Sequence, residues 1–224
     1  MEPRGQTVLL TGATGGLGRA IAAALAGRGA TLVLSSRKAD QLTELAAALA
    51  GEGHRSVVAD LAEPGSAERL AADAGRVDIL VANAGLPAAG RLEGFAPNDI
   101  ERALRVNLEA PIQLARALIE PMRERGRGHL VFVSSLSGKA ATARQSLYSA
   151  TKFGLRGFAL ALRQDLWDTP VGVSVVSPGF VREAGMFADS GAKPPPGLGT
   201  TSPRRVAAAV VEAIERDRGE IAAS

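Results

Sequence analysis

Residues 7–18 read Thr-Val-Leu-Leu-Thr-Gly-Ala-Thr-Gly-Gly-Leu-Gly, and this stretch decides the fold. A short apolar run passes into a glycine-rich turn, and an alanine-rich helical pattern follows over residues 17–26. Glycines at a strand-to-helix turn let backbone N–H groups approach a pyrophosphate at the N-terminus of the helix. The glycines fit two spacings that start at Gly12 and end at Gly18, G-x-x-x-G-x-G and G-x-x-G-x-x-G. The stretch therefore predicts a dinucleotide cradle near the start of the chain.

The rest of the chain repeats this alternation of apolar runs and helical patterns. Most of the runs are continuous in Val, Leu and Ile, which is typical of parallel strands covered on both faces. Repeated strand–helix alternation predicts right-handed crossovers and a three-layer α/β fold with a doubly wound parallel sheet, the Rossmann fold. The expected strands are Thr7–Leu10, Thr31–Leu34, Ser56–Ala59, Asp78–Ala82, Leu130–Val133 and Val173–Val176. The expected helices are Leu17–Ala26, Ala39–Ala50, Ser66–Ala74, Asn98–Arg125, Ser146–Trp167 and Arg204–Arg216, the last opened by Pro203.

The length of the chain and the lack of an internal repeat or linker in the sequence indicate one NADP-binding domain over residues 1–224. Pro111 and Pro121 lack a backbone N–H and should kink or interrupt the long helical segment that contains them. The composition changes over residues 185–201, which carry three consecutive prolines and several glycines. We expect a mobile substrate loop there, because loops after strand C-termini build the ligand sites of this architecture.

Composition narrows the functional class. Hydrophobic residues make up 46% and charged residues 22% of the 224 residues, as in a soluble globular protein. No apolar stretch approaches the ~20 residues that span a bilayer, and the first residues contain no apolar signal core, so a cytoplasmic protein without a membrane partner is expected. Cysteine is absent, which excludes disulfides and thiolate chemistry.

The high pI of 9.8 suggests nucleic-acid binding, but the net charge of only +3 does not support it. Basic and acidic residues alternate along the chain, so no nucleic-acid partner is expected. The densest basic patch is Arg123, Arg125 and Arg127, interrupted by Glu124. A solvated helix end is the favoured interpretation, with docking of an acidic carrier as the alternative. The two histidines have no partners in sequence, so no metal site is predicted.

Tyr148 is the only tyrosine, and Lys152 follows it four residues later. This spacing places both side chains on one face of a helix. A cation within a few ångströms of a phenol favours its ionised form, so the pair predicts a proton donor and acceptor that works near neutral pH. Ser135 lies thirteen residues before Tyr148, at the end of an apolar run.

The end of the second strand indicates the type of cofactor. An acidic residue there would bind a ribose 2′-OH and repel a 2′-phosphate. The chain instead has Ser36 and Arg37, and its first acid after them is Asp40. The guanidinium of Arg37 can bind a phosphate through two hydrogen bonds, so we expect NADP(H).

Together these motifs resemble the short-chain dehydrogenase/reductase family, from about Thr7 to Arg216. The glycine turn, Asp60-Leu61, Asn83-Ala84-Gly85 and Pro178-Gly179 match cofactor-contacting motifs of that family. The catalytic residues implied by the resemblance are Asn107, Ser135, Tyr148 and Lys152. The implied cofactor-binding residues are Gly12, Thr14, Gly15, Gly16, Leu17, Gly18, Ser36, Arg37, Asp60, Leu61, Asn83, Ala84, Gly85, Tyr148, Lys152, Pro178, Gly179 and Val181.

The resemblance implies an NADP-dependent oxidoreductase that moves hydride between nicotinamide and a carbonyl or secondary alcohol. Tyr148 would transfer the proton, Lys152 would lower the tyrosine pKa and bind the ribose, Ser135 would hydrogen-bond the substrate oxygen, and Asn107 would hold a water molecule. Family members commonly have threonine at the position of Glu183. A homodimer or homotetramer through the two long helical segments is expected. The alternative is a non-catalytic NADP-binding sensor or regulatory protein on the same fold.

Overall fold

The computed structural model describes residues 1–182 and 199–224. In these residues a seven-stranded sheet has the order β3-β2-β1-β4-β5-β6-β9, and every neighbouring pair is parallel. A second, two-stranded sheet pairs β7 with β8. The strands are β1 Thr7–Thr11, β2 Thr31–Ser36, β3 Arg55–Val58, β4 Ile79–Ala82, β5 Gly128–Val133, β6 Val171–Pro178, β7 Phe180–Val181, β8 Thr200–Thr201 and β9 Glu220–Ala223.

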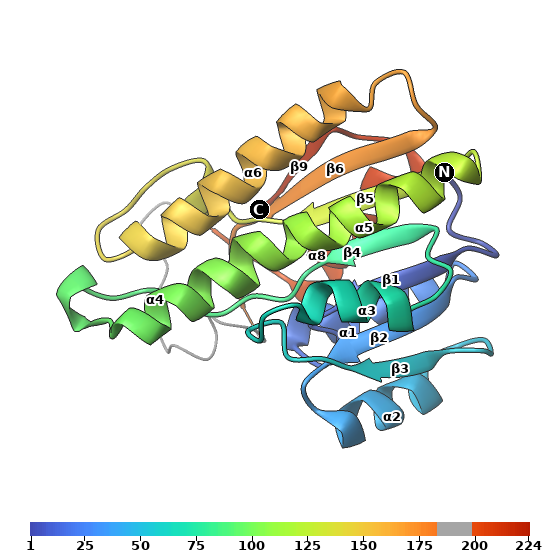
Figure 1. Ribbon diagram of the computed structural model, residues 1–224, viewed down its shortest axis with the longest axis horizontal. Helices are drawn as coiled ribbons and strands as arrows, with labels where there is room; N and C mark the ends of the chain where they lie inside the picture. Colours follow the sequence, from blue (N-terminus) through green and yellow to red (C-terminus); the bar gives the residue numbers. More distant parts are fainter. Residues whose placement is uncertain (183–198) are drawn as a thin grey trace.

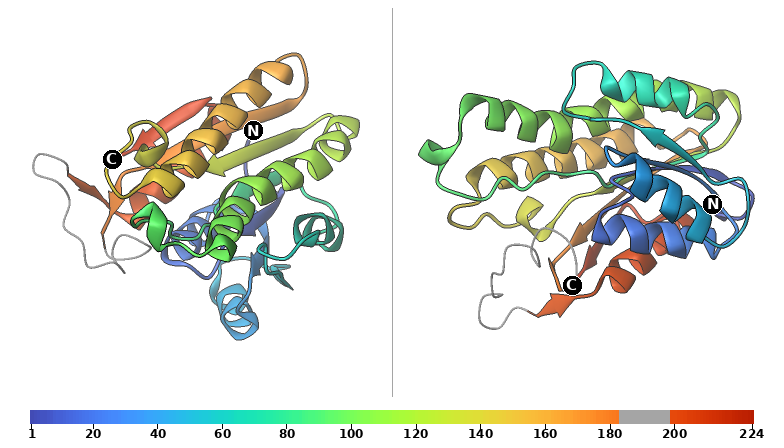
Figure 2. Two further views of the ribbon diagram at one scale, coloured as in Figure 1. Left: turned by 60° about the vertical axis from the view of Figure 1, so that its left-hand side comes forward. Right: turned by 90° about the horizontal axis from the view of Figure 1, so that it is seen from below.

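Helices cover both faces of the large sheet, and the three layers are visible edge-on in the right-hand view of Figure 2. The helices α3, α5 and α6 pack on one face, and α1, α2 and α8 pack on the other (Figure 1). The helices are α1 Gly16–Ala26, α2 Ala39–Ala48, α3 Ser66–Asp73, α4 Pro97–Leu104, α5 Ala110–Glu124, α6 Ser146–Asp165 and α8 Pro203–Glu215, with short 3-10 turns at Leu92–Gly94 and Leu136–Gly138. The predicted doubly wound parallel architecture is confirmed.

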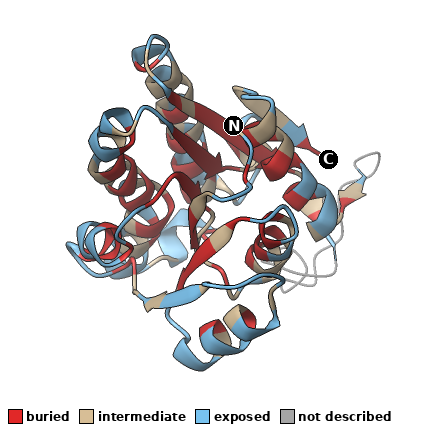
Figure 3. Cartoon of the chain, turned by 90° about the vertical axis from the view of Figure 1, so that its right-hand side faces the viewer, coloured by how far each residue is buried: buried red, intermediate tan, exposed pale blue. Residues whose placement is uncertain are grey.

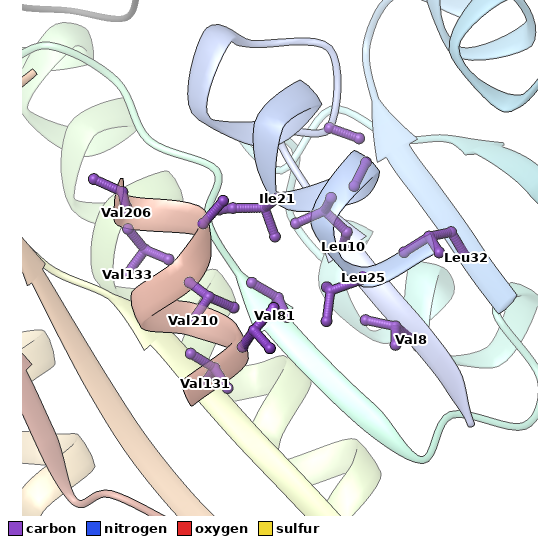
Figure 4. Packing of buried hydrophobic residues seen from close by; sticks show 14 of the residues in the cluster. Val8, Leu10, Ile21, Leu25, Leu32, Val81, Val131, Val133, Val206 and Val210 are labelled. Atoms are coloured by element: carbon purple, nitrogen blue, oxygen red, sulfur yellow. The ribbon is translucent and has the colours of Figure 1, made fainter. Parts of the chain in front are cut away.

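The core consists of two apolar layers, one on each side of the sheet. Ile21 and Leu25 of α1 and Val206 and Val210 of α8 meet the β1, β4 and β5 side chains on one face (Figure 4). Figure 3 shows the same division, with buried strands inside and helices whose outer faces are exposed. This two-sided burial explains why the strands are continuous apolar runs in the sequence.

The winding direction fixes where a ligand can bind. From β1 the chain moves through β2 to β3 on one side, and from β4 it moves through β5 and β6 to β9 on the other. Because all strands are parallel, their C-terminal ends share one edge, and the crevice at the β1–β4 reversal is the expected ligand position.

The long segment predicted as one helix is divided in the structure. Residues Arg105–Glu109 form a π turn between α4 and α5, and Pro111 is the second residue of α5. Pro111 cannot donate a backbone hydrogen bond, so an interruption at this proline is confirmed. The helix α5 continues through Pro121 to Glu124, and no break occurs there.

Two further differences lie toward the C-terminus. The strand β9 was not predicted, and it pairs with β6 at the edge of the large sheet. The predicted substrate loop over residues 185–201 lies mostly outside the described residues, but Thr200 and Thr201 at its end form β8. Glu183 also lies outside the described residues. No helix in the described ranges is long and apolar enough to cross a bilayer.

Candidate active site

The glycine turn between β1 and α1 leaves no space for side chains at two positions. Gly12 has a φ of 64°, and a Cβ there would lie 2.8 Å from the Cα of Ala84. A Cβ on Gly18 would lie 2.1 Å from the carbonyl oxygen of Gly12. Glycine is therefore required at both positions, and the turn brings bare backbone to the N-terminus of α1, where an anion binds favourably.

Asn83 fixes this turn to the neighbouring strand. Its side-chain amide donates to the carbonyls of Thr11 (3.1 Å) and Gly12 (3.2 Å). In return, the Thr11 hydroxyl accepts the backbone N–H groups of Asn83 (3.1 Å) and Ala84 (3.0 Å). These four bonds join the C-terminal ends of β1 and β4 at the point where the winding reverses.

A cavity of about 310 Å³ opens at this crevice. It extends from the glycine turn past the end of β2 and along the loop after β4. Thirteen of the predicted cofactor-binding residues line it: Gly12, Thr14, Gly15, Gly16, Leu17, Gly18, Ser36, Arg37, Asp60, Leu61, Asn83, Ala84 and Gly85. The bare backbone of the turn and the basic residues at one end fit a dinucleotide with its phosphates on α1.

Six residues of the cavity wall were not among the predicted site residues: Thr11, Ser35, Lys38, Ala59, Leu86 and Val106. Thr11 is the last residue of β1, and Ser35 is the residue before the last in β2. Their place at the ends of strands was a signal that the sequence offered. Leu86 and Val106 carry no polar group, and only the three-dimensional structure places them at the cavity.

The β2 end of the cavity carries Ser36, Arg37 and Lys38. The Ser36 hydroxyl accepts the backbone N–H of Lys38 at 3.1 Å. The guanidinium of Arg37 lies 4.0 Å from the Asp60 carboxylate, and about half of its side chain is exposed. Arg37 is thus held near the cavity by a loose, solvent-accessible pair that an incoming phosphate can replace.

Tyr148 and Ser135 meet at the C-terminal ends of the strands nearby. Ser135 follows β5, and its hydroxyl accepts the backbone N–H of Ser137 at 3.1 Å. Tyr148 lies in the first turn of α6 and hydrogen-bonds to Ser135. Although the Tyr148 side chain keeps some solvent exposure, burial raises its pKa, and the hydrogen bond to Ser135 lowers it by a smaller amount. The expectation that the tyrosine pKa is lowered is therefore wrong for the protein without ligand.

Lys152 lies one turn further along α6 and is buried. Its ammonium donates to the carbonyl of Val133 at 3.0 Å and lies 5.7 Å from the centroid of the Tyr148 ring. Burial lowers the pKa of Lys152 to about 8, because the charged form loses its hydration. In the described residues no carboxylate forms an ion pair with this ammonium.

Asn107 sits in the π turn with its side chain fully buried. Its amide oxygen accepts the N–H of Leu86 at 2.7 Å, and its amide nitrogen donates to the Leu86 carbonyl at 3.0 Å and to the Thr151 hydroxyl at 3.4 Å. These contacts use the side chain on the protein itself. Asn107 connects the cavity wall at Leu86 to α6, and among the described residues its side chain makes no hydrogen bond to Lys152 or Ser135.

The remaining predicted residues lie where β6 ends. Pro178 is the last residue of β6, the Gly179 N–H donates to the Ala223 carbonyl at 3.0 Å, and Val181 is buried in β7. Leu136, next to Ser135, packs 3.4 Å from where a Gly179 Cβ would be. This turn therefore faces the loop that carries Ser135, but it does not line the 310 Å³ cavity.

In residues 1–182 and 199–224, no group of three His, Asp or Glu side chains is arranged to hold a metal ion. The site consists of a cradle for a dinucleotide and a hydrogen-bonded pair, Ser135 and Tyr148, near the buried ammonium of Lys152. Both parts lie at the C-terminal ends of the strands. This arrangement can hold a polarised oxygen and move a proton.

Comparisons with known proteins agree with this geometry. The family model described as short chain dehydrogenase matches residues 6–194. The chain is 38% identical over 223 residues to the ketoacyl reductase HetN of Nostoc sp., covering 97% of this chain and 78% of that protein. Two solved structures each have a TM-score of 0.89. The first is a Sphingobium yanoikuyae short-chain dehydrogenase in complex with NADPH, which is 28% identical and is matched over 97% of this chain and 87% of that one. The second is a Burkholderia phymatum short chain dehydrogenase/reductase in complex with NAD, which is 27% identical and is matched over 100% of this chain and 90% of that one. The chain belongs to the short-chain dehydrogenase family.

Proposed function

We propose that the protein is an NADP-dependent oxidoreductase that transfers hydride between nicotinamide and a carbonyl or secondary alcohol, with Tyr148 as general acid and base. The observation that carries the proposal is the hydrogen-bonded pair of Ser135 and Tyr148, with the Lys152 ammonium 5.7 Å from the tyrosine ring. This pair lies on the sheet edge that also carries the glycine cradle. A non-catalytic sensor would need the cradle but not the proton-transfer residues.

The hydroxyl of Ser135 is oriented for this role. Its oxygen accepts the backbone N–H of Ser137, so its own proton is available to donate: to Tyr148 in the ligand-free protein and to a substrate oxygen in the complex. In reduction, Ser135 donates a hydrogen bond to the carbonyl oxygen, where negative charge develops, and Tyr148 delivers the proton to that oxygen. Bound nicotinamide supplies the hydride at its C4 position.

Lys152 then stabilises the phenolate that remains on Tyr148. Its ammonium is charged below a pKa of about 8, and the buried position strengthens its attraction for a nearby anion. In alcohol oxidation the same phenolate accepts the proton. The raised pKa of Tyr148 keeps the acid form available for reduction across the neutral range.

Asn107 would act through its backbone, since its side chain is occupied by Leu86 and Thr151. Pro111, four residues later, has no N–H to donate to the Asn107 carbonyl. We propose that this carbonyl holds a water molecule that connects Lys152 to solvent.

NADP(H) is the cofactor that the end of β2 favours. Ser36 and Arg37 line the cavity there, and the nearest acid in the wall, Asp60, already faces the guanidinium of Arg37. Pro178, Gly179 and Val181 would border the nicotinamide, and residues 1–224 would form one NADP-binding domain. Relatives have been solved with either NADPH or NAD, so the basic residues carry this choice.

We also propose that the protein forms a homodimer or homotetramer through the long helices. Leu104 at the end of α4 and Phe153 on α6 are about 40% exposed, and contact with a second copy through these helices would remove their apolar surface from water. Sedimentation at micromolar concentration measures the assembly, and a monomer mass would contradict it.

The experiment that tests the function is a panel of ketones and aldehydes with NADPH, followed at the nicotinamide absorbance. The panel should include 3-oxoacyl thioesters, because the relative HetN is a ketoacyl reductase. Tyr148→Phe should retain NADPH binding and lose at least ~10²-fold in turnover. NADPH binding without turnover of any substrate would favour the sensor, and near-native turnover of Tyr148→Phe would overturn the proposed mechanism.

A further inference from the structure

Two buried hydroxyls hold the turn of α6 that carries Tyr148 and Lys152. Ser134 Oγ donates to the backbone carbonyl of Lys152 at 3.0 Å, and Thr151 Oγ1 donates to the carbonyl of Tyr148 at 2.8 Å. Ser134 is 4% exposed and Thr151 is fully buried. Neither residue lines the cavity, and among the described residues neither hydroxyl is bonded to the side-chain hydroxyl of Ser135 or Tyr148.

Ser134 connects α6 to the central sheet. Its N–H donates to the Val176 carbonyl at 2.8 Å, so its backbone continues the pairing of β5 with β6 while its hydroxyl reaches α6. The packing is close, since a Cβ on Gly138 would lie 2.6 Å from the Lys152 carbonyl oxygen and 2.7 Å from Ser134 Oγ. Because Ser135 is the next residue, this contact determines how far Ser135 lies from Tyr148.

Thr151 makes a second connection on another side of the same turn. Its hydroxyl accepts from Asn107 Nδ2 at 3.4 Å while it donates to the Tyr148 carbonyl. Asn107 is in turn bonded to both backbone groups of Leu86 in the cavity wall. Leu86, Asn107 and Thr151 therefore form a continuous chain of hydrogen bonds from the cavity wall to the Tyr148 carbonyl in α6.

We propose that Ser134 and Thr151 are positioning residues that set the distance of the Tyr148 and Lys152 side chains from Ser135. This inference rests on the function proposed above. They touch no reacting atom and act through the backbone carbonyls of the proton-transfer residues. Proton and hydride transfer are sensitive to such placement, because a displacement of about 1 Å in a catalytic group can reduce a rate by ~10²-fold.

The kinetic test uses Ser134→Ala and Thr151→Val, which remove the hydroxyls with little change in volume. Each should lower kcat by about tenfold through misplacement of the catalytic turn while the NADPH Kd stays within about twofold. The isotope effect with C4-deuterated NADPH should not fall, because the slowed step is hydride transfer itself. Ser134→Thr and Thr151→Ser keep a hydroxyl and should recover most of the rate.

The matched control is Ser174→Ala. Ser174 is also a fully buried serine with a hydrogen-bonded hydroxyl, 2.8 Å from His129 Nε2, but it lies in the middle of β6 and its hydroxyl bonds to His129 near the start of β5 and not to α6. This variant should lose stability to a similar extent and keep the wild-type kcat. Equal losses of kcat in Ser174→Ala and Ser134→Ala, or unchanged kcat in both Ser134→Ala and Thr151→Val, would overturn the proposal.

A second measurement does not depend on turnover. Tyr148 is the only tyrosine, so tyrosinate absorbance reports its titration alone. Loosening the turn weakens the hydrogen bond to Ser135 that lowers the Tyr148 pKa, so the midpoint should rise in Ser134→Ala and stay constant in Ser174→Ala. If the wild type turns over no substrate, the proposed function fails, and this midpoint decides the positioning proposal: an unchanged value in Ser134→Ala overturns it.

Discussion

Replacing Lys152 by methionine should stabilise the ligand-free protein. Burial lowers the pKa of Lys152 from 10.5 to about 8, a difference of about 2.5 units, which corresponds to about 3 kcal/mol for keeping the charged form buried at pH 7. Methionine fills a similar volume and removes this cost. It also removes the hydrogen bond to Val133 and the contact with the Tyr148 ring, together about 1–2 kcal/mol. The expected net gain at pH 7 is about 1–2 kcal/mol, with loss of turnover.

The pH dependence tests the cause of this gain. Between pH 8 and 10.5 the unfolded chain keeps the Lys152 proton while the folded protein releases it, so the wild type gains stability as pH rises. Urea unfolding at pH 7 and pH 9.5, without cofactor, should show a wild-type increase of about 2 kcal/mol from this group. Lys152→Met should lack this increment, so the gap between the two proteins narrows.

Two results would refute this reasoning. The first is a Lys152→Met protein that is less stable than the wild type at pH 7, which would mean that the ammonium is stabilised by its surroundings. The second is an identical change in stability with pH in both proteins, which would assign the titration to another group. Arg156→Met provides a contrast: it removes a cation that forms two hydrogen bonds to Glu220, so it should destabilise the protein at pH 7.

Three other predictions follow from the site and from the opposite edge of the sheet. Arg37→Ala should weaken NADPH binding by about 1–3 kcal/mol and leave NADH binding almost unchanged, as measured by calorimetry; equal losses would contradict the NADP assignment. Gly18→Ala should abolish dinucleotide binding and lower the Tm, because the new Cβ overlaps the Gly12 carbonyl, and a protein that still binds NADPH normally would show that the turn can shift. Asp78→Asn should cost about 2 kcal/mol in urea unfolding at pH 7, since its buried carboxylate faces Arg76 and two further arginines. The pKa of Asp78 is lowered, so this contribution is present above 3.8 and is lost as pH falls below that value; a wild-type advantage that persists at pH 2 would exclude this cause.

The sheet could be predicted from sequence because two-sided burial leaves a strong pattern. Each of the six predicted strands is present, and its ends lie within two residues of the predicted ends. The glycine turn was equally informative, because positions such as Gly18 tolerate no other residue for steric reasons that do not depend on distant parts of the chain. The cofactor cavity follows from these two features.

The parts that were missed depend on tertiary contacts. The strand β9 is short and weakly apolar, and it is held in place by Glu220, which pairs with Arg156 and Lys139 from distant parts of the chain. The raised pKa of Tyr148 was also missed, because the spacing of Tyr148 and Lys152 shows their proximity but not the burial that dominates both titrations. Ser134 was not among the predicted residues, because its hydrogen bond to the Lys152 carbonyl depends on the packing of α6 and leaves no pattern in the sequence.

The buried charges at the two ends of the parallel strands have opposite effects on stability: one end is the N-terminal edge of the sheet and the other is its C-terminal edge. This difference agrees with the place of the candidate site. At the N-terminal edge the buried Asp78 carboxylate accepts the Thr7 N–H and faces Arg76, which precedes β4, and Arg125, which follows α5, so its charge is well compensated. At the C-terminal edge Lys152 is buried without a carboxylate partner among the described residues, and the glycine turn exposes bare backbone. An acid beside Lys152 would relieve the cost of burial, but it would also neutralise the charge needed to stabilise a Tyr148 phenolate. The burial of this ammonium without an acid among the described residues therefore suits the proposed chemistry, whereas the Asp78 cluster at the opposite edge stabilises the fold.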